Sequence, residues 1–231
     1  MPTASSFLAI VSIASIASMV SIESIESIIF YPLNSIKMPM PLSIQTPDGS
    51  NRILLHTCCA PCSSAIIECL LQHSITPVVY YCNPNIYPQE EYLIRKNECS
   101  RYAQSLGLEI VDADYDHDAW LQKMKGLENE PERGARCLNC FKMRLLDTAR
   151  YAHEHGFTVI TTTLASSRWK SLEQINEAGS WATSQFPDVI FWDQNWRKGG
   201  LQERRLAIIK EYNFYNQQYC GCEFSMQRLL K

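Results

Sequence analysis

Residues 52–70 read RILLHTCCAPCSSAIIECL, and this stretch decides the fold. The apolar run Ile53–Leu55 is typical of a buried strand. After Pro61 the apolar residues repeat with helical spacing, at Ala65, Ile66, Cys69 and Leu70. A strand that leads directly into a helix is the building unit of a parallel α/β sheet, so this stretch predicts that class of fold.

The same unit recurs along the chain. Apolar or β-branched runs predict four more strands, at 77–82, 109–113, 158–163 and 189–192. Helical patterns alternate with them, at 90–106, 118–125, 138–155, 171–186 and 201–213. We therefore predict a three-layer α/β domain with a mostly parallel, five-stranded Rossmann-like (HUP-like) sheet and helices on both faces. Such sheets bind ligands at the carboxyl ends of their strands.

The composition excludes a disordered chain, because 46% of the 231 residues are hydrophobic and only 19% are charged. The net charge of -3 argues against binding built mainly on phosphate neutralisation. Residues 12–29 repeat a Ser-Ile triplet that marks no helix face, and no Lys or Arg precedes Lys37, so neither a secretory signal nor a membrane span is favoured. We expect residues 1–50 to be a disordered or non-native low-complexity extension and residues 51–231 to form a single α/β domain.

The chain has ten cysteines, and seven fall into three groups: Cys58-Cys59-x-x-Cys62, Cys137-x-x-Cys140 and Cys220-x-Cys222. Two Cys-x-x-Cys pairs suit either zinc or an iron-sulfur cluster, and spacing alone leaves both open. The additional thiols exceed what a structural zinc site needs, and a Cys-Gly-Cys turn can form a strained, redox-active disulfide. Such thiols require a reducing compartment, which predicts a cytoplasmic protein. The isolated residues Cys69, Cys82 and Cys99 are expected to pack in the core.

The loop after the first strand, HTCCAPC at 56–62, contains no glycine. Phosphate-binding loops at this position need glycine for close approach of the backbone, so a nucleotide-phosphate site is not expected. The loop instead brings thiols to a helix N-terminus, where the helix dipole favours the ionised, metal-binding form.

Several segments together resemble the cobalamin-independent epoxyqueuosine reductase family, QueH. They are HTCCAPCS at 56–63, YYCNPNIYPQEEYLIRK at 80–96, CLNCFKMRL at 137–145, TTTLASSRWKSLEQINEAG at 161–179, NWRKGG at 195–200 and YNQQYCGCEFS at 215–225. The resemblance spans residues 52–226. The chain departs from it at Arg168-Trp169, where family members usually carry Pro-Tyr, at Trp196, where they carry Phe, and at Asn216, where they carry Arg.

The resemblance implies an oxidoreductase that reduces epoxyqueuosine to queuosine at the wobble position of tRNA, the last step of queuosine biosynthesis. It implies a [4Fe-4S] cluster held by Cys58, Cys59, Cys137 and Cys140, and a redox-active pair, Cys220 and Cys222. Cys62 is then left either for an additional mononuclear iron or to exchange with one of these four ligands. The family requires an electron donor, which the sequence leaves open, and residues 51–231 would form the iron-sulfur reductase domain.

Two other classes remain as alternatives. An iron-sulfur enzyme that transfers sulfur to tRNA would need ATP, and hence a glycine-rich first loop, which is absent from this sequence. A zinc-stabilised RNA-binding module would be colourless and would not need the Cys-Gly-Cys pair.

Recognition of an anticodon loop calls for basic and aromatic side chains near the site. Two loops at the predicted ligand edge, 168–170 and 196–198, supply such groups. We expect the basic and aromatic residues of these loops to contact the RNA, and we predict Lys170 and Arg197 as substrate-binding residues. The residues concerned are Arg168, Trp169, Lys170, Trp196, Arg197 and Lys198. We expect the proton donor for the epoxide oxygen to be one of four residues that follow the second strand: Tyr87, Glu90, Glu91 or Tyr92.

Overall fold

The computed structural model describes residues 42–229. Most of the extension expected at 1–50 therefore lies outside the described residues. Of its last part, Leu42 and Ile44 pack against the hydrophobic core, and Thr46 is buried.

The sheet has five strands in the order β3-β2-β1-β4-β5, and every neighbouring pair is parallel. The strands are β1 (Arg52–His56), β2 (Thr76–Tyr81), β3 (Ile110–Asp112), β4 (Val159–Thr162) and β5 (Ile190–Phe191). β1 lies in the middle, and its residues Ile53 to Leu55 are fully buried because both faces of the sheet are covered. The predicted fold class is confirmed.

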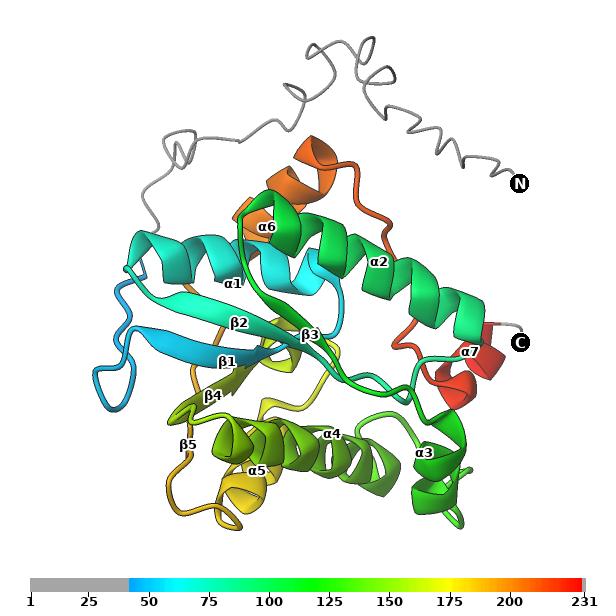
Figure 1. Cartoon of the computed structure of the whole chain (residues 1–231). Helices are drawn as coiled ribbons and strands as arrows, with labels where there is room; N and C mark the ends of the chain where they lie inside the picture. The colour runs from blue at the N-terminus through cyan, green and yellow to red at the C-terminus, as the bar shows by residue number, and fades with distance from the viewer. Residues whose placement is uncertain (1–41, 230–231) are drawn as a thin grey trace, which may run out of the picture. The chain divides into compact units, whose positions relative to one another are not determined.

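Helices cover both faces of the sheet (Figure 1). α1 (Ala60–Gln72), α2 (Gln89–Ser105) and α6 (Leu201–Glu211) lie on one face, and α4 (Ala135–Glu154) and α5 (Leu172–Thr183) pair on the other. α3 (His117–Met124) and α7 (Glu223–Leu229) lie beyond the carboxyl ends of the strands. The sequence predicted neither α7 nor the short 3₁₀ helix Thr163–Ser166, η3.

The helix ends follow local chemistry. Ser171 caps α5, because its Oγ accepts a hydrogen bond from the amide of Gln174 at 3.2 Å, while the Gln174 side chain donates to the Arg133 carbonyl instead of completing a capping box. α4 begins three residues earlier than the predicted 138, because the Glu130 carboxylate accepts from the amide of Ala135 at 3.0 Å and so satisfies a free donor of its first turn.

The core is formed by the apolar faces of the sheet and its helices, and it includes the isolated cysteines Cys69, Cys82 and Cys99, as predicted. A second, smaller core joins Trp120 and Met124 of α3 to Cys140 and Cys222. No helix within residues 42–229 is both long enough and apolar enough to cross a lipid bilayer.

The chain order creates a switch point between β1 and β4. From β1 the chain runs outward through β2 to β3, then returns to β4 on the other side of β1. The loops after β1 and β4 therefore diverge to opposite faces, which leaves a crevice at the carboxyl ends of the two strands. These loops carry Cys58 and Lys170.

Candidate metal and redox site

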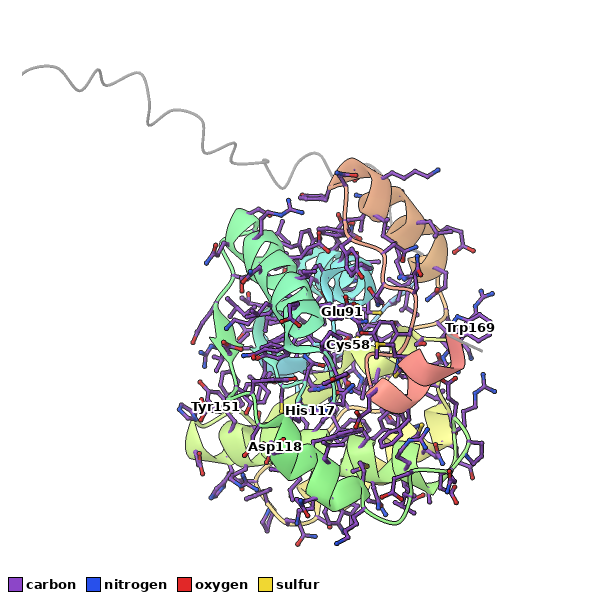
Figure 2. The ribbon with its side chains drawn as sticks, turned by 90° about the vertical axis from the view of Figure 1, so that its right-hand side faces the viewer. Cys58, Glu91, His117, Asp118, Tyr151 and Trp169 are labelled. Atoms are coloured by element: carbon purple, nitrogen blue, oxygen red, sulfur yellow. The ribbon has the colours of Figure 1, made fainter. Side chains whose placement is uncertain are left out.

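A cavity of about 670 Å³ opens at this edge of the sheet. Its wall contains cysteines of all three sequence groups: Cys58, Cys62, Cys137, Cys140, Cys220 and Cys222. Figure 2 views the molecule from this edge and places Cys58 near its middle. The fold thus brings together thiols that are up to 164 residues apart in sequence, from Cys58 to Cys222.

The first group forms a compact set of sulfur atoms. The sulfurs of Cys58, Cys59 and Cys62 all lie within 4.8 Å of one another. Cys59 is the N-cap of α1, and Pro61 in the first turn fixes the helical backbone there, so Cys62 lies one turn further along the same helix end. Cys58 is held from the other side of the crevice, since its amide donates to Thr163 Oγ1 at 3.1 Å.

The three thiols differ in how readily they ionise. Hydrogen bonds from Cys59 and Cys62 lower the pKa of Cys58 well below its usual value, and Lys170 and Thr163 lower it further. Burial raises the pKa of Cys59, and the hydrogen bond with Cys58 raises that of Cys62 to about 11. A buried set of soft sulfur ligands with one thiolate already favoured fits zinc, iron or an iron-sulfur cluster, and does not fit a hard cation.

Gln217 closes this group from the C-terminal side. Its Nε2 donates to Cys59 Sγ at 2.9 Å and approaches Cys62 Sγ at 3.9 Å. Its Oε1 is buried without a partner among the described residues. The side chain is therefore oriented by the sulfurs.

Cys137 and Cys140 belong to a different wall. Both lie in α4, across the sheet from α1, and they are outside the compact set of three sulfurs. Burial raises the pKa of Cys137 to about 11 and also raises that of Cys140. The structure thus groups Cys62 with Cys58 and Cys59, and places the predicted ligands Cys137 and Cys140 on the opposite wall of the same cavity.

The third group lies on the segment between α6 and α7, residues 213–222, which we call the C-terminal strap. Cys220 is exposed, whereas Cys222 is buried and its thiol donates to Ser225 Oγ at 3.4 Å. Burial raises the pKa of Cys222 to about 11. Gly221 between them has a φ of 120°, and an added Cβ would lie 3.0 Å from Ile86 Cγ1. Only glycine fits there without displacing a neighbour.

Arg95 of α2 holds the strap in place. Its guanidinium is buried in an ion pair with Glu91 and donates to the carbonyls of Cys220 and Tyr219 at 3.2 and 3.3 Å. Tyr87 also contributes, because its amide donates to the Gly221 carbonyl at 2.8 Å. Sequence reasoning missed Arg95, since an arginine on a helix normally faces solvent.

Lys170 lines the cavity, as a substrate-binding residue should. Burial lowers its pKa, but the negative charges of Cys220, Cys58 and Cys62 outweigh that effect, and the net pKa is raised. Arg197 lies outside the cavity wall and donates to the Lys170 carbonyl at 2.9 Å. Trp196 is fully buried and donates to Thr161 Oγ1 at 3.2 Å, so the expectation that it contacts RNA is wrong.

None of the four predicted proton donors is among the residues that line the cavity in the described part of the chain. Tyr92 points to the outer strand β3 and donates to Asp112 at 2.9 Å, and Glu91 pairs with Arg95. Other residues that follow β2, Asn83, Asn85 and Ile86, do line the cavity, so the four side chains are kept out of it by their own contacts and not by the position of β2.

A further cation that the sequence analysis missed, Arg144, is buried in the wall behind the sulfurs. It donates to the Cys82 carbonyl at 3.1 Å and to Asn83 Oδ1. Burial lowers its pKa, but the charges of Cys140, Cys58 and other thiols raise it above the usual value. A buried guanidinium beside sulfurs stabilises negative charge on them.

Sequence comparisons agree with this geometry. The family model described as "Epoxyqueuosine reductase QueH" matches residues 53–228. Proteins of that name from Haemophilus influenzae and Histophilus somni are 50% and 49% identical to the chain over 184 residues, which cover 80% of this chain and 75% and 76% of theirs. The protein of that name from Acinetobacter baylyi is 48% identical over 186 residues, which cover 80% of this chain and 85% of its own. The chain therefore belongs to the epoxyqueuosine reductase QueH family.

Proposed function

We propose that this chain reduces epoxyqueuosine to queuosine at the wobble position of tRNA, the last step of queuosine biosynthesis. The observation that carries the proposal is the convergence of three separate cysteine groups on one cavity with cationic walls. Family membership supports the assignment, and the glycine-free loop after β1 disfavours an ATP-dependent sulfur transfer.

The residues present fit an iron-sulfur centre. Cys58, Cys59 and Cys62 would supply a compact set of thiolates, and Cys137 and Cys140 would supply the remaining ones from α4. We propose a [4Fe-4S] cluster held by Cys58, Cys59, Cys137 and Cys140, with Cys62 serving an additional mononuclear iron or exchanging with one of the four. When bound, such a centre supplies single electrons and Lewis acidity toward the epoxide oxygen.

The reaction requires two electrons and two protons. Both carbon-oxygen bonds of the epoxide break, a carbon-carbon double bond forms in the ring, and the oxygen leaves as water. Oxidation of the thiols of Cys220 and Cys222 to a disulfide releases two electrons and two protons, so this pair balances one turnover. An external dithiol or other two-electron reductant must then restore the thiols, and Cys220 is exposed to meet it.

Lys170 is proposed to bind the substrate directly. Its side chain lines the cavity, and its ammonium group can donate a hydrogen bond from Nζ to the departing oxygen. Arg197 would act on the substrate through Lys170, since its guanidinium holds the Lys170 carbonyl. The reduced thiols and the tRNA substrate together favour a cytoplasmic location.

The test uses the full chain, purified without oxygen and reconstituted with iron and sulfide. It is incubated with dithionite and an anticodon stem-loop RNA that carries epoxyqueuosine, and the nucleosides are separated by mass. The proposal expects a brown protein that removes one oxygen atom from the modified nucleoside. A colourless protein that binds zinc and leaves the nucleoside unchanged would overturn it in favour of a zinc-stabilised RNA-binding module.

A further inference from the structure

Trp169 is the most exposed of the large hydrophobic side chains in the described part of the chain, with 82% of its surface accessible. It follows β4 and belongs to the wall of the cysteine cavity. Figure 2 shows it at the outer edge of the face on which Cys58 lies near the middle. An indole left in water forgoes the free energy of burial, so its place at the rim calls for an explanation.

The loop that carries Trp169 is tied down at several points. Arg133 Nε donates to the Trp169 carbonyl at 3.0 Å, and Arg133 also donates to the Arg168 carbonyl at 3.1 Å. The Trp169 amide donates to Ser167 Oγ at 3.3 Å. Gln174 of α5 in turn holds the Arg133 carbonyl at 2.8 Å. The exposed indole is therefore presented by a fixed backbone.

The surroundings of Trp169 are positively charged. Arg133 and Arg168 line the same cavity, and the hydrogen bonds of Arg133 go to carbonyl oxygens, which do not neutralise its charge. Burial lowers the pKa of Arg197, and the charges of Arg133 and Arg168 lower it further. The nearby carboxylate of Glu132 accepts a hydrogen bond from Ser225 at 2.7 Å. The loop that carries Trp169 and its surroundings thus hold three guanidinium groups, those of Arg133, Arg168 and Arg197.

We propose that Trp169 stacks on a nucleobase of the anticodon loop next to the wobble nucleotide, while Arg133 and Arg168 contact the adjoining phosphates. This inference rests on the proposed function. When the wobble nucleotide enters the cavity, the nucleotides next to it in the RNA remain at the rim. Proteins hold unpaired bases by aromatic stacking and hold their backbone by positive charge, and the rim offers both within one short loop.

The first measurement is the Kd of a fluorescently labelled anticodon stem-loop RNA that carries epoxyqueuosine. Trp169→Ala should weaken binding about 5- to 150-fold, the loss that one stacked base accounts for, and Trp169→Phe should retain most of the affinity. Trp181→Ala is the matched control, because Trp181 is a partly exposed tryptophan of α5 outside the cavity wall. It should leave the Kd unchanged.

Salt dependence separates stacking from charge. The slope of log Kd against log salt should be the same in Trp169→Ala and wild type, because an indole releases no counterions. Arg168→Ala should reduce that slope by about 0.7, the contribution of one phosphate contact on a single strand. Equal changes in slope for both variants would contradict the division of roles.

A set of stem-loops with one abasic site each identifies the stacked base. The penalty of Trp169→Ala should disappear with the RNA that lacks the base next to the wobble position and persist with the others. If every RNA binds wild type and Trp169→Ala equally, the inference fails while the proposed function stands. If wild type binds none of them, the proposed function fails first. If Trp169→Ala binds RNA as wild type does but turns over more slowly when a protein supplies the electrons, then Trp169 contacts that reductant. This result would overturn the inference.

Discussion

The first cysteine group and the C-terminal strap line the same cavity but are held in different ways. Cys58, Cys59 and Cys62 are positioned by regular structure, because they stand where the buried strand β1 passes into α1. Cys220 and Cys222 lie outside regular structure or at its edge, and side chains of another helix hold them, chiefly Arg95. A metal centre needs fixed ligands, whereas a thiol pair that exchanges electrons must remain reachable. The contrast fits these separate roles.

The largest expected effect is loss of metal from the first group. Cys58→Ser removes a thiol whose pKa lies well below its usual value. Loss of a residue that only hydrogen-bonds to a metal ligand lowers metal affinity by up to about 100-fold, so loss of the ligand itself should lower the affinity for iron by more than that. Iron and sulfide analysis after reconstitution measures it. Cys69→Ala is the control, because Cys69 is a core residue of α1 and should leave iron content unchanged. Equal iron content in wild type and Cys58→Ser would contradict the assignment of roles.

Arg95→Met should release the strap and leave the first group in place. It leaves the Glu91 carboxylate buried without its partner, so we expect the free energy of unfolding to fall by about 3–5 kcal/mol in urea titrations. Amide exchange should accelerate in residues 213–222, while iron content stays at the wild-type level.

The control for that variant is Asn97→Ala. Asn97 is an exposed residue of the same helix, so its loss should change the free energy of unfolding by at most about 0.5 kcal/mol. The double variant Glu91→Gln with Arg95→Met should recover part of the stability. Loss of iron together with the strap would show that the two regions are not independent.

Gln217→Leu probes the contact between the two regions and should have the smallest effect. It removes the hydrogen bond from Nε2 to Cys59 Sγ, and the metal-free, reduced chain should lose about 0.5–1.5 kcal/mol of unfolding free energy. Gln218→Leu, at the exposed neighbouring position, is the control. A loss several times larger would mean that Gln217 is a main support of the strap.

Much of the fold could be predicted from the sequence, because apolar runs and helix caps are local signals. The predicted run Ile53–Leu55 lies within β1, and the ends of the other four strands differ from the predicted ends by one residue. The rule that parallel strands end at one edge placed Cys58 there, since Cys58 follows β1 directly. The meeting of the other two cysteine groups with it was implied only by the resemblance to the family.

The details of the site depend on contacts that are not local. Spacing grouped Cys62 with Cys58 and Cys59, but it could not place Cys137 and Cys140 on the opposite wall of the cavity, because the packing of α4 against the sheet decides that. Trp196 was predicted to contact RNA, yet it fills the core beside β4. Arg95 is buried because Glu91 and the carbonyls of the strap surround it, and the strap is distant from it in sequence. α7 was missed for another reason, since its seven residues are too few for a clear periodic pattern.

The strap follows the other walls of the cavity along the chain, and this order has a consequence for assembly during translation. β1, α1, α4 and β4 all leave the ribosome before Gln217 and Cys220 do. Because a domain generally folds as a unit, the cavity around Cys58 is complete only when this last wall has been synthesised.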